Sequence, residues 1–146
     1  MPIKDLCFKN PVTIKKENTL TEAAKRMEDE GVGALVVMDQ NKKAVCILTD
    51  RDIVVSAVAH GKPMNTKVSE VMIKNVLCVS RDAGVAEVID KMEKREVRRA
   101  IIVEKDDRVC GIISSDDLMQ LLGNELQSLG NLVSRQVSRK GLSKAG

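Results

Sequence analysis

The chain contains an internal repeat that constrains its fold more than any other feature of the sequence. When the chain is shifted against itself by 65 positions, residues 3–57 align with residues 68–122 without a gap. The alignment contains several pairs of identical residues, among them Asn10 and Asn75, Glu22 and Glu87, Ile47 and Ile112, and Asp52 and Asp117. A fixed period of this kind indicates two copies of one supersecondary unit. Because the chain has only 146 residues, a large enzyme scaffold such as a (β/α)₈ barrel is excluded.

Each copy has the hydrophobic pattern of a mixed unit of strands and helices. In the first copy, a capping box at Thr19–Glu22 opens a helix that ends at Gly31. Two apolar runs separated by a polar turn then predict a hairpin, and a second helix follows. The predicted elements are strands at 12–14, 34–38 and 44–48 and a helix at 51–59 in the first copy, and a helix at 85–95, strands at 100–104 and 109–113 and a helix from about 116 in the second.

The two copies are expected to pack on each other. One unit of about 55 residues buries too little apolar surface to be stable alone, and the polar connector is too short to let the halves separate. We therefore predict an α/β (α+β) architecture in which two sheets pack face to face around a pseudo-twofold axis, with two equivalent clefts. The predicted divisions are a first domain at 1–60, the connector at 61–67, a second domain at 68–123 and a C-terminal extension at 124–146.

Aromatic residues are nearly absent, with one Phe and neither Tyr nor Trp. A bound base would have to be held by aliphatic side chains and backbone, because stacking on aromatic rings is not available. This composition argues against the common platforms for single-stranded nucleic acid. The abundance of β-branched and other aliphatic residues instead favours strands buried under helices.

The cysteines contain no C-x-x-C pair, so we expect no zinc site. All four lie in or beside apolar runs and are predicted to be buried structural residues: Cys7, Cys46, Cys78 and Cys110. No apolar stretch is long enough for a membrane span, and the N-terminus lacks a signal-peptide pattern. We expect a cytoplasmic protein without a membrane partner.

Residues 124–146 carry four basic residues and one acidic residue, whereas charges in the rest of the chain balance. The formal net charge of +3 therefore belongs to this tail. The tail is either a solvated end of the chain or a contact for nucleic acid or an acidic partner. Apolar residues at helical spacing between Leu126 and Val137 could extend the last helix or supply a dimer contact, although Gly130 disfavours a helix.

Each copy ends its second hairpin strand with a hydroxyl residue that is followed, three positions later, by an aspartate. The pairs are Thr49 with Asp52 and Ser114 with Asp117. One interpretation is structural, because this spacing at a helix start forms a capping box. The other is functional, because N–H groups at a helix start attract phosphate and carboxylates accept hydrogen bonds from ribose. In that case Thr49 and Ser114 contact phosphate, and Asp52 and Asp117 contact ribose.

Two arginines make the copies chemically unequal. Arg98 and Arg99 precede the first hairpin strand of the second copy, where guanidinium groups suit phosphate oxygens. The equivalent segment of the first copy is Gly33–Ala34. The alternative is that the arginines form ion pairs with Glu93 or Glu96 at the end of the preceding helix.

A catalytic role is not indicated. His60 is the only histidine and lies beside the connector, so a Ser-His or Cys-His nucleophile arrangement has no base. The sequence also has no Walker loop, G-x-G-x-x-G or H-E-x-x-H motif. We expect no enzymatic activity, no catalytic residue and no metal site.

The tandem period, the turns at Cys46–Asp52 and Gly111–Asp117 and the run Val97–Arg99 together resemble a pair of cystathionine β-synthase (CBS) domains, a Bateman module, over about residues 3–123. The resemblance implies β-α-β-β-α units that pair within the chain, and a homodimer of such modules. It also implies an adenosine-type ligand in the clefts between units: AMP, ADP or ATP, with NAD or S-adenosylmethionine as alternatives.

The family pattern marks eight positions of this sequence as implied ligand contacts: Thr49, Asp52, Ser114, Asp117, Arg98, Arg99, Ile14 and Val79. Of these, Arg98 and Arg99 would lie near phosphate, and Ile14 and Val79, on the short early strands, would contact the base. The sequence departs from the pattern at Cys46, which replaces a usual glycine and adds a side chain where a ligand or strand approaches. It also lacks the usual hairpin proline, which is replaced by Val36 and Ile101.

Two hypotheses of different classes follow. The first is a regulatory, energy-sensing module that binds an adenine nucleotide and transmits its state to a separate regulated protein. The second is a non-catalytic scaffold with empty clefts, whose helical faces and basic tail contact a partner or nucleic acid.

Overall fold

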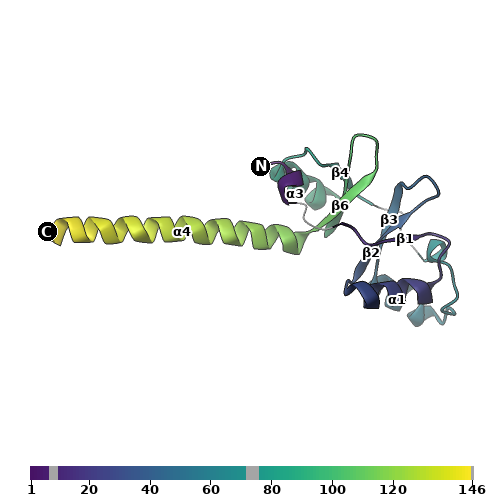
Figure 1. Ribbon diagram of the computed structural model, residues 1–146. Coiled ribbons are helices and arrows are strands. Elements are labelled where there is room, and N and C mark those ends of the chain that lie inside the picture. The colour runs from purple at the N-terminus through teal and green to yellow at the C-terminus, as the bar shows by residue number, and fades with distance from the viewer. Residues whose placement is uncertain (7–9, 72–75, 146) are drawn as a thin grey trace. The chain divides into compact units, whose positions relative to one another are not determined.

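The computed structural model describes residues 1–6, 10–71 and 76–145, with side chains up to residue 139. The chain forms two compact parts, residues 1–113 and 114–146. Its strands and α-helices, most of which are labelled in Figure 1, are β1 (Thr13–Lys15), α1 (Leu20–Glu30), β2 (Ala34–Met38), β3 (Ala44–Thr49), α2 (Asp50–Ser56), β4 (Cys78–Ser80), α3 (Val85–Arg95), β5 (Arg99–Val103), β6 (Val109–Ser114) and α4 (Ser115–Ala145). Three short 3₁₀ helices are η1 (Ile3–Leu6), η2 (Val58–His60) and η3 (Val68–Glu70).

The predicted fold class is confirmed: the two copies form two three-stranded sheets with the orders β1-β2-β3 and β4-β5-β6. In the first sheet, β1 runs parallel to β2, with Ile14 opposite Val37, and β2 and β3 form the predicted antiparallel hairpin. In the second sheet, β4 runs parallel to β5, with Val79 opposite Ile102. The central strands β2 and β5 are buried on both faces, as expected when a sheet is covered by helices on one side and by other chain segments on the other.

The helix boundaries follow from local capping. The Thr19 side chain accepts a hydrogen bond from the Glu22 N–H at 3.2 Å, and Gly31 ends α1 in the left-handed region at φ 64°. This confirms the predicted first helix. By contrast, α2 is shorter than predicted, because it ends at Ser56 and the chain continues into η2. The β-branched run Ile53–Val55 lowers the helix propensity of this segment.

The two copies exchange their 3₁₀ entry segments. The Ile3 N–H donates to the Ala83 carbonyl at 2.7 Å, so η1 of the first copy lies on the second, and the Val68 N–H donates to the Asn18 carbonyl at 2.8 Å in the reverse sense. The next residue of each segment forms a matching bond, from Lys4 to Arg81 at 2.9 Å and from Ser69 to Lys16 at 3.0 Å. Every one of these pairs maps onto its counterpart by the 65-residue shift, so the exchange obeys the predicted pseudo-twofold relation.

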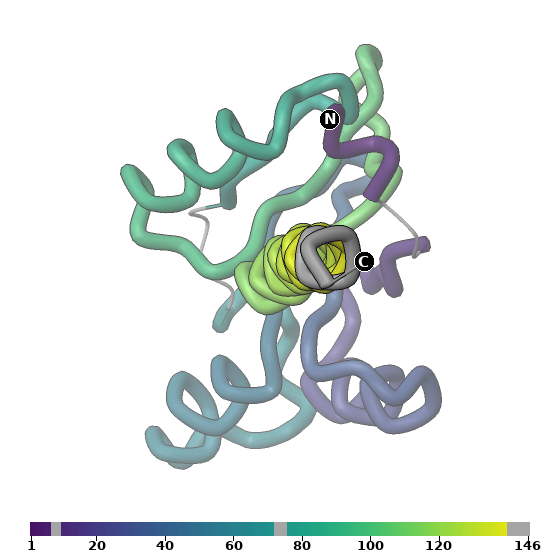
Figure 2. Tube along the Cα trace, turned by 90° about the vertical axis from the view of Figure 1, so that its left-hand side faces the viewer, coloured from purple at the N-terminus to yellow at the C-terminus, as the bar shows by residue number. Residues whose placement is uncertain are grey.

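Figure 2 shows the N-terminal segment, in purple, beside the teal α3 segment of the second copy. Ile3 and Val68 are both completely buried, and Val68 belongs to the core of the first copy together with residues of α1, β2 and β3. The core of the first copy therefore contains a residue from the start of the second, and the buried Ile3 from the start of the first copy is bonded to the second. Separation of the two copies would therefore break these bonds and expose Val68 and part of the first core.

The cysteines differ in environment. Cys46 is fully buried in the first core, as predicted. The prediction is wrong for Cys78, which is exposed because β4 alternates and only its central residue, Val79, points inward. Cys110 is half-buried, with its thiol donating to the Ile102 carbonyl at 3.4 Å. Cys7 lies outside the described residues.

Burial raises the pKa of the Cys46 thiol to about 12, and the nearby Asp52 carboxylate contributes to the increase. An unfolded thiol ionises near its usual value of 9.0. Between these values the unfolded chain releases a proton that the folded chain retains, so the free energy of unfolding falls as the pH rises. We expect the free energy of unfolding of the wild type to fall more steeply with pH than that of Cys46→Ala, and the difference to approach about 1.4 kcal/mol per pH unit. Urea denaturation of both proteins at several pH values between about 8 and 11 would measure the difference.

Parallel slopes for the two proteins would contradict the assignment of this pH dependence to Cys46. The Cys46→Ala variant is expected to be less stable at every pH, because it leaves a small cavity. That constant offset does not affect the comparison of slopes.

The second part of the chain is dominated by α4, a single uninterrupted helix of 31 residues (Figure 1). Of the alternatives left by the sequence, helical extension of the tail is confirmed. Gly130, which disfavours a helix, is tolerated in its interior, because one glycine there costs only about 1 kcal/mol and is flanked by helix-compatible residues. No helix in the described part of the chain is both long and apolar enough to cross a bilayer.

Candidate functional site

The turn from β3 into α2 contains the first predicted pair of hydroxyl and carboxylate. The Asp52 N–H donates to Thr49 Oγ1 at 3.1 Å, and the Thr49 N–H donates to Asp52 Oδ2 at 2.8 Å. This is a complete capping box. The two bonds do not involve the Thr49 hydroxyl proton or the Asp52 Oδ1 atom, which are the groups that could contact a ligand.

The second copy repeats this arrangement within residues 114–146. The Asp117 N–H donates to Ser114 Oγ at 3.1 Å, and the Ser114 N–H donates to Asp117 Oδ2 at 2.9 Å. The capping interpretation of both pairs is therefore confirmed. It does not exclude a ligand role, because a capping box uses only some of the polar atoms of its two side chains.

The alternation of β3 decides which side chains can reach a ligand. Cys46 and Leu48 are fully buried in the first core, whereas Ile47 and Thr49 point to the other face and are only partly buried. Of the two alternatives for Cys46, approach of a ligand is therefore wrong, because this side chain lies in the core, where Cys46 is opposite Val37 of β2.

A pocket of about 280 Å³ lies between the two copies, and we call it the inter-repeat pocket. The structure brings four of the predicted site residues to it, namely Thr49 and Asp52 from the first copy and Arg98 and Arg99 from the second. The remaining lining residues are aliphatic: Ile47, Val76, Leu77 and Val97. The pocket thus combines two guanidinium groups, a hydroxyl, a carboxylate and an apolar wall.

The two arginines are available to a ligand. Within the described residues, neither Arg98 nor Arg99 forms an ion pair, so the alternative pairing with Glu93 or Glu96 is not found. Arg98 is exposed and directly precedes β5, and Arg99 is the half-buried first residue of that strand. Two cations without carboxylate partners at the wall of a pocket favour an anionic ligand.

The first copy presents the opposite charge at the corresponding place. Gly33 is the counterpart of Arg98, and a Cβ atom added there would lie 3.2 Å from Asp50 Oδ2. The Asp50 N–H also donates to the Gly33 carbonyl at 3.0 Å, which holds the residue in place. A carboxylate therefore lies beside the residue that corresponds to Arg98, which adds to the chemical inequality predicted for the two copies.

Ile14 and Val79 do not line the inter-repeat pocket. Both side chains are buried on strands whose inward face forms the cores, at 8% and 1% exposure. Instead, Val76 and Leu77, which precede β4, reach the pocket. Neither residue was predicted as a ligand contact. Leu77 is 5% exposed and Val76 is half-buried, and nothing in the local pattern separates them from ordinary apolar residues before a strand.

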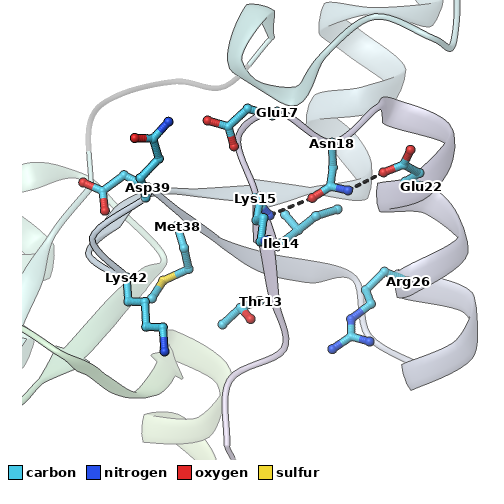
Figure 3. Close-up of a pocket in the computed structure, with 11 residues that line it drawn as sticks. Thr13, Ile14, Lys15, Glu17, Asn18, Glu22, Arg26, Met38, Asp39 and Lys42 are labelled. Carbon is cyan, nitrogen blue, oxygen red and sulfur yellow. Dashed lines mark hydrogen bonds between the residues drawn. The ribbon is translucent and has the colours of Figure 1, made fainter.

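A larger pocket of about 1020 Å³ lies within the first copy, beside β1, α1 and the turn after β2 (Figure 3). Ile14 lines it, but the other predicted ligand contacts do not. Its charged groups are mixed, with Lys15, Arg26 and Lys42 alongside Glu17, Glu22 and Asp39. Several polar groups are already engaged: Asn18 bonds to Glu22 and to the Lys15 N–H, and Asp39 caps its own turn. The inter-repeat pocket is the better candidate for a phosphate-bearing ligand.

Metal binding has no support in the described part of the chain. Its side chains include no group of three or more His, Cys, Asp or Glu residues placed to hold a metal ion.

Known proteins resemble this chain in both structure and sequence. The CBS domain pair of protein MJ0100, solved in complex with 5′-methylthioadenosine and S-adenosyl-L-methionine, is 31% identical, with a TM-score of 0.76, and the match covers 86% of this chain and 98% of that chain. The uncharacterized protein YlbB of Bacillus subtilis is 36% identical over 117 residues, which are 80% of this chain and 78% of YlbB. The uncharacterized protein MK0525 of Methanopyrus kandleri is 27% identical over 82% of this chain, which spans 61% of the length of that relative.

The family comparison agrees with the internal repeat. The CBS domain is matched twice, at residues 3–58 and at residues 68–124. These two segments correspond to the two copies found from the 65-residue shift, and together they make up most of the chain. The protein therefore belongs to the CBS domain family and contains a tandem pair of CBS domains.

Proposed function

We propose that this chain is a non-catalytic regulatory module that binds an adenosine-type nucleotide in the inter-repeat pocket. The observation that carries the proposal is the meeting of Thr49 and Asp52 with Arg98 and Arg99 at one pocket between the copies. These residues are separated in sequence and come from different copies, so their convergence depends on the pairing of the two domains. The adenosyl ligands in the name of the MJ0100 structure support the same ligand class.

Each group has a proposed role. The Arg98 and Arg99 guanidinium groups bind phosphate oxygens, and the Thr49 hydroxyl donates a further hydrogen bond to phosphate. The Asp52 carboxylate accepts hydrogen bonds from ribose hydroxyls. Val76 and Leu77 contact the base through aliphatic surface, since the chain has no Tyr or Trp on which a base could stack.

The size of the pocket favours a small nucleotide. At about 280 Å³, it lies just below the usual range for small-molecule sites. AMP is therefore preferred over ADP, ATP or NAD, whose additional groups would extend outside the pocket. S-adenosylmethionine is disfavoured for another reason, because its sulfonium is a cation and would face two arginines.

One phosphate-bearing ligand per chain is expected. Ser114 and Asp117 repeat the hydroxyl and carboxylate of the first turn, and we propose the same contacts for them. However, the first copy offers Gly33 and the Asp50 carboxylate where the second offers arginine. We therefore expect the segment around Gly33 to bind an anionic group more weakly than Arg98 and Arg99 do.

The module would act on a separate protein. A ligand held by both copies can bias the angle between them only if it binds one arrangement more tightly, and a tenfold preference corresponds to about 1.4 kcal/mol. We also propose that the module forms a homodimer and that the protein it regulates is a separate chain.

Calorimetric titration with AMP, ADP, ATP, NAD and S-adenosylmethionine tests the proposal. AMP is expected to bind with one site per chain, and 2′-deoxy-AMP about tenfold more weakly, because Asp52 loses a hydrogen bond. In Asp52→Asn the difference between AMP and 2′-deoxy-AMP is expected to shrink. The proposal would be contradicted if none of the ligands bound at about 1 mM. At that concentration, binding with a free energy of only about 4 kcal/mol is still detected.

A further inference from the structure

A line of apolar side chains along α4 is exposed. Met119, Leu122, Leu126, Leu129 and Val133 follow one another at alternating intervals of three and four residues, and their exposed fractions range from 49% to 71%. This spacing is the a and d pattern of paired helices. Gln136 continues it at the next d position. We call these six residues the α4 seam.

The helix needs a partner for its own stability. Gly123 and Gly130 lie in its interior, and each glycine lowers helix stability by about 1 kcal/mol relative to alanine. Helices in proteins gain most of their stability from packing of an apolar face rather than from intrinsic propensity. The seam is such a face, with large side chains and the period of a helix pair.

Charge complementarity along α4 indicates what covers the seam. Residues 115–129 contain three acids and no base, whereas residues 130–145 contain bases and no acid. The helix dipole explains charges only in the first and last turns, but Glu125 and Arg135 lie well inside the helix. A second copy in parallel would place acid beside acid and base beside base, whereas an antiparallel copy places each acidic half beside a basic half.

We propose that α4 is a dimerisation helix that pairs antiparallel with α4 of a second copy of this chain. In an antiparallel pair, each a position lies beside a d position of the other helix. In the most apolar register, Leu126 lies beside Leu129 of the partner subunit, and the two symmetric contacts of this kind form the centre of the pair. Leu122 then lies beside Val133 of the partner subunit, and Met119 beside Gln136 of the partner subunit. The same register places Gly123 beside Gly130 of the partner subunit along one edge, where the absence of side chains lets the helices approach closely.

This surface is distinct from the inter-repeat pocket, and its existence does not depend on the proposed ligand. All residues of the seam belong to the part of the chain after residue 113. The dimer is therefore expected with or without nucleotide.

Disulfide trapping in the full-length protein tests the direction of pairing. Leu122→Cys combined with Val133→Cys is expected to give a covalent dimer under mild oxidation, because the two positions meet across the antiparallel pair. Leu122→Cys alone is expected to behave as the wild type, since the two copies of residue 122 would lie about 16 Å apart at 1.5 Å per residue. In a parallel pair the single variant would cross-link, and that result would overturn the proposal. The wild-type chain, with its own cysteines, gives the baseline.

Sedimentation analysis of full-length variants tests the seam itself. Leu126→Asp is expected to weaken dimerisation at least a hundredfold, because it places unpaired carboxylates at the centre of the interface. The matched control is Gln127→Asp, which adds the same charge on the outer side of the helix and is expected to change the dissociation constant less than threefold. A monomeric wild type, or a dimer that Leu126→Asp leaves intact, would overturn the proposal.

Discussion

Replacement of Arg98 and Arg99 together by alanine is expected to weaken AMP binding at least a hundredfold. Both guanidinium groups line the inter-repeat pocket and neither forms an ion pair within the described residues, so their loss removes charge-assisted bonds to phosphate without breaking structure. Each such bond contributes about 1.5–3 kcal/mol, which corresponds to a factor of ten or more for each single variant. Calorimetric titration of the single and double variants would measure the loss.

Adenosine is the matched ligand for this experiment, because it lacks phosphate. Its affinity is expected to change less than threefold in the double variant. Arg108→Ala is the matched protein control, since Arg108 belongs to the same copy, is exposed and pairs with Asp106 at 2.6 Å. Equal losses for AMP and adenosine would show that the arginines act on the fold rather than on phosphate.

A change of Ile3 to alanine is expected to lower the free energy of unfolding by about 2–4 kcal/mol, although the residue lies almost at the N-terminus. The side chain is completely buried, and the backbone N–H donates to the Ala83 carbonyl at 2.7 Å. Because this segment lies on the second copy, the loss is expected to appear there. Urea denaturation gives the total change, and hydrogen exchange locates it, with reduced protection in β4 and β5.

Val68→Ala is the reciprocal variant, and Ile3→Val is the conservative control. Val68 is equally buried but belongs to the core of the first copy, so its replacement is expected to reduce protection in β1 and β2 first. Ile3→Val removes one methyl group and is expected to cost only about 0.5–1.5 kcal/mol. A loss of protection confined to the first copy in Ile3→Ala would contradict the exchange of segments.

Local pattern was sufficient to predict most elements, because the signals lie within a few residues of the structure they specify. The capping box at Thr19–Glu22, the left-handed Gly31 and the apolar runs of the hairpin each depend on neighbouring residues only. The boundaries that failed are those where local preferences are weak or opposed. In α2 a β-branched run ends the helix early. For α4 the local pattern left the tail open between alternatives, and the structure shows that the helix continues through Gly130.

Side-chain direction was harder to predict than element type, because a strand sends successive side chains to opposite faces. A change of one residue in the assumed phase moves a side chain from the pocket into the core. Cys46 lies in the core as predicted, but Cys78 was also expected in the core and is exposed. Val76 and Leu77 line the inter-repeat pocket because the pairing of the two copies places the segment before β4 beside Thr49 and Asp52.

The amino-acid sequence alone determined that this chain contains two equivalent units, the residues that cap each strand-to-helix turn and the chemical inequality of Arg98 and Gly33. These features are encoded in residue identity and spacing, which a repeat makes visible. Only the tertiary structure decided that Thr49 and Asp52 share a pocket with Arg98 and Arg99, and that Ile3 and Val68 each complete the packing of the other copy. Such contacts join residues distant in the chain, and they exist only once burial of apolar surface has brought the two units together.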